Sequence, residues 1–121
     1  MSKILLIDDD TNIHEIVSLF LEQAGHNVAC VSSGPSGLDY AAQNRVDLII
    51  LDLAMPVMDG VETFSKLRAH PNCRDVPIMI LSVHTQTEVG EDNISGDGVS
   101  FVNKPIDMQH LVHAVDTAIA G

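Results

Sequence analysis

Short apolar runs alternate with longer stretches of helical spacing along this chain of 121 residues. The apolar runs are residues 4–7, 27–31, 48–51 and 78–81, with a weaker fifth run at residues 99–102. Their length is that of a short β-strand. Because they are continuously apolar rather than alternating, they predict strands that are buried on both faces of a sheet.

The stretches between these runs predict helices. The clearest one ends at Gly25 and has apolar residues repeating at three and four positions, namely Ile13, Ile16, Val17, Phe20, Leu21 and Ala24. Further helices are expected at residues 35–44, 61–69, 85–94 and 108–119. The helix at residues 85–94 is the weakest of them, because glycine and short polar residues are frequent there.

The alternation of strand and helix predicts one architecture. Parallel strands that are joined by right-handed helical crossovers form a sheet with helices on both faces. The sequence therefore predicts an α/β domain with a five-stranded, doubly wound parallel sheet flanked by five helices. Its length suits a single domain over residues 1–121.

The charge balance narrows the range of partners. Aspartate and glutamate total 17 against 6 lysines and arginines, which gives a formal net charge of -11. We expect no direct contact between such an acidic domain and nucleic acid, whose phosphates it would repel. The acids at residues 8–10 interrupt the apolar N-terminal run, so neither a secretory leader nor a membrane segment is expected.

Two pairs of residues with metal-binding or redox potential are interpreted as structural. Cys30 lies in an apolar run that is expected to be core, so a disulfide with Cys73 is not expected and a cytoplasmic location fits both thiols. His110 and His113 lie one helical turn apart, but no third ligand is in view. Both histidines are therefore expected to face solvent.

Acidic, hydroxyl and amine side chains follow the expected strands. Asp8 and Asp9 follow the first strand, Asp52 the third, Ser82 the fourth and Lys104 the fifth. In a doubly wound sheet the ligand site lies at the carboxyl ends of the strands, so these side chains are expected to meet. Three carboxylates at one place repel one another unless a cation neutralises them. Oxygen ligands of this kind suit Mg²⁺, with Asp9 and Asp52 as direct ligands.

Each of these residues has a simpler explanation when it is taken alone. An acid such as Asp52 after a strand is ordinary turn chemistry, and Asp10 is expected to cap the first helix. Ser82 and Lys104 alone would be a cap residue and a surface lysine. Lys104 precedes Pro105, a context in which a cis peptide can occur. Only the combination of these residues favours a metal and phosphate site.

The whole chain resembles the receiver domains of two-component response regulators. The residues that carry the resemblance are the acidic pair Asp8 and Asp9, residues 51–60 around Asp52, residues 77–81 followed by Ser82, and residues 101–105 with Lys104. The resemblance implies a flavodoxin-like fold of the receiver type and a phosphoprotein of phosphorelay signal transduction. It implies no enzyme activity beyond self-phosphorylation and self-dephosphorylation.

The resemblance also implies how the acids act. Asp52 would accept a phosphoryl group from a histidine kinase or a histidine phosphotransfer protein, with Mg²⁺ as the cofactor. The metal ligands would be Asp9, Asp52 and the backbone carbonyl of Ala54, with Asp8 acting through a water molecule.

The remaining roles that the resemblance implies concern the switch. Lys104 would pair with the phosphoryl group, and Ser82 would move to bond it while Phe101 turns inward. A downstream output domain or protein would bind the face formed by residues 85–94, 99–102 and 108–119. Whether this domain forms a homodimer stays open.

Some positions depart from the family pattern. Val83 follows Ser82 where a small residue is usual, and Phe101 replaces the commoner tyrosine. Val83 and the weak helix at residues 85–94 favour the alternative of a pseudo-receiver, an interaction module that works without phosphorylation. An aspartyl-phosphate hydrolase for small molecules ranks third, because Ala54 stands where it would need a second acid.

Overall fold

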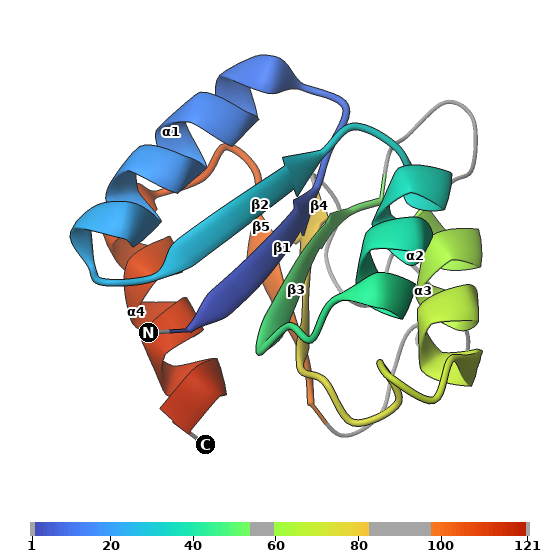
Figure 1. Ribbon diagram of the computed structural model, residues 1–121. Coiled ribbons are helices and arrows are strands. Elements are labelled where there is room, and N and C mark those ends of the chain that lie inside the picture. The colour runs from blue at the N-terminus through green and yellow to red at the C-terminus, as the bar shows by residue number, and fades with distance from the viewer. Residues whose placement is uncertain (1, 54–59, 83–97, 121) are drawn as a thin grey trace.

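The computed structural model describes residues 2–53, 60–82 and 98–120, which form a sheet between two layers of helices (Figure 1). Its elements in chain order are β1 (Lys3–Ile7), α1 (Thr11–Gln23), β2 (Asn27–Val31), α2 (Gly34–Gln43), β3 (Leu48–Asp52), α3 (Gly60–Ala69), β4 (Ile78–Ser82), β5 (Val99–Asn103) and α4 (Met108–Ala120). All five predicted strands are confirmed to within one residue at each end. Four of the predicted helices are confirmed, and the one at residues 85–94 lies outside the described residues.

The sheet is parallel throughout, and its strand order is β2-β1-β3-β4-β5. The chain begins inside the sheet at β1, moves to the edge with β2, and then crosses back to β3. The strand order therefore reverses between β1 and β3, which confirms the doubly wound prediction. Ligands of such sheets bind at the carboxyl ends of the strands beside this reversal.

Alternate residues of the strands face opposite helical layers. Those toward α2 and α3 include Leu5, Ile7, Ile49, Leu51, Ile78 and Ile80. Those toward α1 and α4 include Ile4, Leu6, Leu48, Ile50, Met79 and Leu81. Figure 1 shows the same division, with α1 and α4 on one side of the sheet and α2 and α3 on the other. The burial of each such side chain contributes about 1.5–3 kcal/mol, so the two clusters hold the strand ends in a rigid frame.

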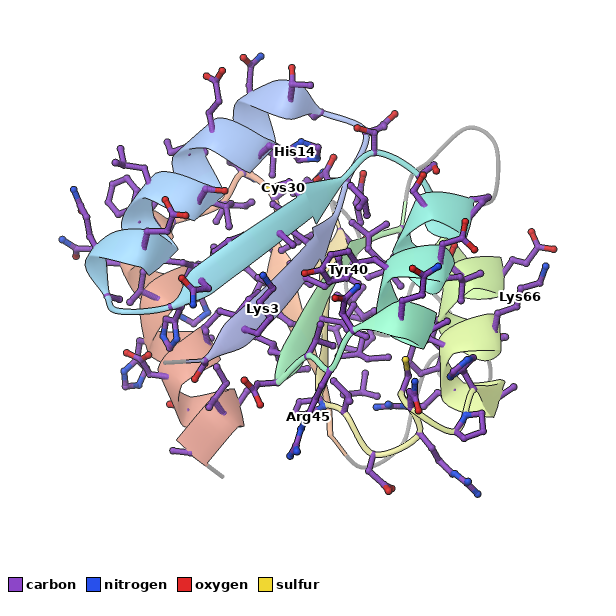
Figure 2. The ribbon with its side chains drawn as sticks, in the orientation of Figure 1. Lys3, His14, Cys30, Tyr40, Arg45 and Lys66 are labelled. Atoms are coloured by element: carbon purple, nitrogen blue, oxygen red, sulfur yellow. The ribbon has the colours of Figure 1, made fainter. Side chains whose placement is uncertain are left out.

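Strand β2 differs from the prediction of burial on both faces. It lies at the edge of the sheet, and its residues are only half-buried or exposed. Cys30, which was expected in the core, is exposed near the end of β2 (Figure 2), and its Sγ lies 3.2 Å from Oγ of Ser18. The expectation for Cys30 is wrong because an edge strand has a neighbour on one side only. Cys30 and Cys73 are both free thiols, as predicted.

Fewer apolar residues of α1 are buried than the sequence pattern predicts. Val17 and Leu21 are buried, whereas Ile16 is 42% exposed although it belongs to the predicted stripe. The helix gives way to Gly25, whose φ of 96° lies in the left-handed region that glycine adopts without strain. None of the helices within the described residues combines the length and apolar character needed to cross a lipid bilayer.

Candidate functional site

The carboxyl ends of the strands bring most of the predicted site residues to one edge of the sheet. Asp52 is the last residue of β3 and lies beside Leu81 of β4 in the parallel register. Ser82 ends β4, while Asp8 and Lys104 directly follow β1 and β5. The parallel strands thus place acidic, hydroxyl and amine side chains, which are far apart in the sequence, at the same edge of the sheet.

Asp8, Asp9 and Asp52 form an acidic cluster. One carboxylate oxygen of each residue lies within 4.8 Å of those of the others. Asp8 is 0% and Asp52 is 3% exposed, whereas Asp9 is open to solvent. Within residues 2–53, 60–82 and 98–120 this is the one group of three metal-ligating side chains so close together. The structure therefore unites the three acids that were expected to meet.

Lys104 brings a positive charge to the acidic cluster. Its Nζ lies 3.2 Å from Oδ1 of Asp52 and 3.5 Å from Oδ2 of Asp8. Burial by itself lowers the pKa of Lys104, but the attraction of Asp52 and then of Asp8 outweighs it, so the pKa is raised. Lys104 is therefore charged at neutral pH. The Lys104–Pro105 peptide is cis, as the sequence context allows.

The carboxylate of Asp8 is only half satisfied. Its Oδ1 accepts a hydrogen bond from the backbone N–H of Asp10 at 2.9 Å, whereas its buried Oδ2 has only the long ion-pair contact with Nζ of Lys104 at 3.5 Å and no well-formed hydrogen bond among the described residues. Burial raises the pKa of Asp8, and the charge of Asp52 raises it further, against the opposing effects of the Asp10 bond and of Lys104. A cation bound in the cluster would compensate both the buried oxygen and the excess of negative charge.

The comparison with protein families decides the identity of this fold and site. The sequence profile of the response regulator receiver domain matches residues 4–116. This chain belongs to that family. Receiver domains are regulatory phosphoacceptors of two-component systems rather than enzymes with a separate substrate, and the acidic cluster with Lys104 is consistent with Mg²⁺-dependent phosphorylation of aspartate.

Curated relatives of the receiver domain are transcriptional regulators. Over 115 residues the chain is 33% identical to the DNA-binding dual master transcriptional regulator RpaA of Synechocystis sp.. The aligned region covers 95% of this chain and 48% of that protein. Over 117 residues the chain is 32% identical to the transcriptional regulatory protein GlrR of Escherichia coli. The aligned region covers 96% of this chain and 26% of that protein. The chain therefore spans about half or a quarter of the length of these relatives.

Solved structures with the same fold are also receiver proteins. The chain is 30% identical to the chemotaxis response regulator CheY4 of Vibrio cholerae, with a TM-score of 0.90 and coverage of 98% of both chains. It is 25% identical to the receiver domain of the sensor histidine kinase PA1611 of Pseudomonas aeruginosa, with a TM-score of 0.87 and coverage of 99% of this chain and 98% of that one. That domain carries a magnesium ion coordinated in its active-site cleft.

The predicted switch residues are described in part. Ser82 is buried at the end of β4. Phe101 is half-buried and packs against the core cluster on the side of α2 and α3. Ala54, the predicted source of a carbonyl ligand, and Val83 lie outside the described residues.

Other residues that the sequence singled out have structural places. Asp10 caps α1 as predicted, because its side chain accepts a hydrogen bond from the backbone N–H of Asn12 at 2.9 Å. His110 and His113 are exposed on α4, as expected, and they take part in no group of three metal-ligating residues in the described part of the chain.

Gly60 supports the receiver site in a way that the sequence analysis missed. Its backbone N–H donates to the carbonyl oxygen of Leu53 at 3.0 Å. A Cβ at this position would lie 2.3 Å from the Cα of Leu53 and 2.8 Å from the carbonyl oxygen of Asp52. Glycine therefore lets the start of α3 approach the strand end that carries Asp52. The sequence places Gly60 in a family-like segment, but only the fold gives the reason for it.

The charge imbalance at Asp8 gives a stability prediction. We expect Asp8→Asn to raise the free energy of unfolding by about 1 kcal/mol at neutral pH without Mg²⁺, because it removes a buried carboxylate whose pKa is raised. When folding raises the pKa of a carboxyl group, the free energy of unfolding falls as the pH rises from the pKa of that group in the unfolded chain to its pKa in the folded domain. The advantage of the variant should therefore shrink as the buffer is acidified through that pH range.

Urea denaturation of the metal-free domain at several pH values measures this effect. The exposed Asp39 on α2 supplies the control, and Asp39→Asn should leave stability within about 0.5 kcal/mol of the unsubstituted chain. If Asp8→Asn were less stable than the unsubstituted chain at neutral pH, the ionised Asp8 would be a stabilising group and the prediction would be wrong.

Proposed function

We propose that Asp52 accepts a phosphoryl group from a histidine kinase or a histidine phosphotransfer protein in a Mg²⁺-dependent reaction. One observation carries this proposal: the buried Asp52 carboxylate ends β3 within reach of Asp8, Asp9 and the charged Lys104. In this reaction a carboxylate oxygen of Asp52 attacks phosphorus while the phosphorus–nitrogen bond to the donor histidine breaks. The histidine nitrogen leaves with the electron pair, and an acyl phosphate remains on Asp52.

The donor set of the acidic cluster fits Mg²⁺. All its side-chain ligands are hard oxygen atoms, and within the described residues the buried Oδ2 of Asp8 has only the 3.5 Å contact with Lys104 and no well-formed hydrogen bond. We assign Asp9, Asp52 and the Ala54 carbonyl as direct ligands, with Asp8 acting through water, as the resemblance to receiver domains implies. The receiver domain of PA1611, which has the same fold, holds a magnesium ion in its active-site cleft. A bound Mg²⁺ would neutralise charge on the phosphoryl oxygens.

Lys104 and Ser82 complete the proposed chemistry. The ammonium of Lys104 lies 3.2 Å from Asp52 and would attract the phosphoryl oxygens that arrive there. Ser82 ends the neighbouring strand and offers a hydroxyl to the same group. Movement of Ser82 toward the phosphoryl group, with an inward turn of Phe101, would change the surface around β5 and α4.

We propose this surface as the binding face for a downstream output domain or protein. It comprises β5, α4 and, as the sequence predicts, residues 85–94. Transcriptional relatives that are two to four times longer are compatible with an output domain that receives the signal, while the receiver domain itself avoids nucleic acid because of its charge of -11. A homodimer through the same face is compatible with this arrangement. We assign residues 1–121 to one receiver domain, and two free thiols suit the reducing cytoplasm.

Phosphorylation by a small donor tests the proposal directly. Incubation with phosphoramidate and Mg²⁺ should add the mass of one phosphoryl group to the intact protein, and an excess of EDTA should prevent the addition. A chain that gains no phosphoryl mass from phosphoramidate, and none from a panel of phosphorylated histidine kinases, would be a pseudo-receiver. In that case binding partners should associate equally well with or without the donor.

A further inference from the structure

We propose that His14 is a positioning residue for the Mg²⁺ site, because its imidazole holds the peptide unit that joins Asp8 to Asp9. The inference rests on the proposed function of the acidic cluster and adds a residue to it. His14 lies in α1, outside the cluster, and neither its sequence position nor its neighbours suggested a role. Figure 2 shows its ring pointing from α1 toward the sheet.

A hydrogen bond from the ring carries the inference. Nε2 of His14 lies 2.5 Å from the backbone carbonyl oxygen of Asp8. A carbonyl oxygen can only accept, so Nε2 must carry the hydrogen and donate it. The backbone N–H of His14 donates to the carbonyl oxygen of Asp10 at 3.2 Å, which places the backbone of His14 in the first turn of α1. His14 thus ties the loop after β1 to the helix that follows it.

The orientation of the Asp8 carbonyl determines how the chain continues into Asp9. The N–H of Asp8 donates to the carbonyl oxygen of Val31 at 3.1 Å, and its Oδ1 accepts from Asp10 at 2.9 Å. The carbonyl oxygen of Asp8 and the N–H of Asp9 belong to one planar peptide unit. By holding that oxygen, His14 sets the plane of the peptide and therefore the direction in which Asp9 leaves the strand.

Asp9 depends on this restraint more than the other two acids do. Asp8 and Asp52 are enclosed by the protein, with 0% and 3% exposure, but Asp9 is open to solvent. Packing therefore contributes little to the orientation of Asp9, and the backbone must provide it. Because Asp9 is a proposed direct ligand, loss of the His14 hydrogen bond should weaken Mg²⁺ binding while the protein stays folded.

Direct titration with Mg²⁺ alone, in the absence of a phosphodonor, tests the role of His14. By isothermal calorimetry, His14→Ala should bind Mg²⁺ about tenfold more weakly than the unsubstituted chain, as for other residues that orient metal ligands. His14→Gln should bind within about threefold of it, because its amide nitrogen has nearly the reach of Nε2 and can donate to the same carbonyl. His14→Asn is too short to do so and should resemble His14→Ala. The exposed His113 provides the control variant His113→Ala, with unchanged affinity.

The kinetics of phosphorylation give a second readout that a purely structural role would not produce. With phosphoramidate as the donor, His14→Ala should need more Mg²⁺ for half-maximal rate, while its rate at saturating Mg²⁺ stays within about twofold. If the unsubstituted chain neither binds Mg²⁺ nor becomes phosphorylated, the proposed function fails. If it does both and all His14 variants bind Mg²⁺ equally, only the role of His14 is overturned. If His14→Ala does not fold, the comparison of His14→Gln with His14→Asn decides in the same way.

Discussion

Asp52→Asn should abolish phosphorylation, with the rate of phosphoryl addition falling by at least about 10³-fold. The substitution keeps the size and shape of the side chain but replaces a carboxylate oxygen by an amide nitrogen, which is no nucleophile at neutral pH. Asp52 is 3% exposed at the end of a fully buried strand, where a change of side-chain size would disturb the packing. Because asparagine has nearly the same size and shape as aspartate, the substitution should leave the fold intact. Intact-mass spectrometry after incubation with phosphoramidate and Mg²⁺ measures the loss.

Two controls separate a lost acceptor from a damaged domain. Asp39→Asn, on the exposed surface of α2, should become phosphorylated like the unsubstituted chain. Circular dichroism should give the same helix and strand content for Asp52→Asn and for the unsubstituted chain. Peptide mapping should locate the phosphoryl group on Asp52. Phosphorylation that persists in Asp52→Asn, or that maps to another residue of the unsubstituted chain, would remove Asp52 from its proposed role.

The positions of the strands could be predicted closely, because a short apolar run between polar segments has few other structures available. The run at residues 78–81 became β4 (Ile78–Ser82), and even the weak run at residues 99–102 became β5. The order of the strands across the sheet is not encoded in such runs. For this reason the apolar runs alone do not give the edge position of β2, and with it the exposure of Cys30.

The members of the acidic cluster could be predicted because they share a topological position. Parallel strands point their carboxyl ends toward one edge, so acids that follow different strands must approach one another there. The supporting residues follow no such rule. Gly60 matters because α3 touches the end of β3, and His14 because its ring reaches the carbonyl of Asp8. Both depend on the path of loops between elements, which hydrophobic periodicity does not determine.

Lys104→Met should slow phosphorylation by roughly 10²–10³-fold, the usual cost of losing one group that stabilises transferring charge. Methionine keeps an unbranched apolar chain but removes the ammonium that lies 3.2 Å from Asp52. Rates of phosphoryl addition from phosphoramidate, measured at saturating Mg²⁺, test this step. The matched control is Lys66→Met, because Lys66 is exposed on α3, and the ion pair that it makes with Glu62 at 3.9 Å lies at the surface.

Lys104→Met should also destabilise the metal-free domain, by about 1–2 kcal/mol at neutral pH. Asp52 and Asp8 raise the pKa of Lys104 in the folded domain. Its ammonium therefore stabilises the folded state fully at pH values below the pKa of a lysine in the unfolded chain, and this stabilisation is lost as the pH rises through the pKa of Lys104 in the folded state. Without the ammonium, the buried Asp8 and Asp52 repel each other with no compensating charge. Asp8→Asn should therefore restore part of the lost stability, and a double-mutant cycle in urea should yield a favourable Lys104–Asp8 coupling. Strictly additive effects of the two substitutions would mean that the 3.5 Å contact between them contributes nothing to the fold.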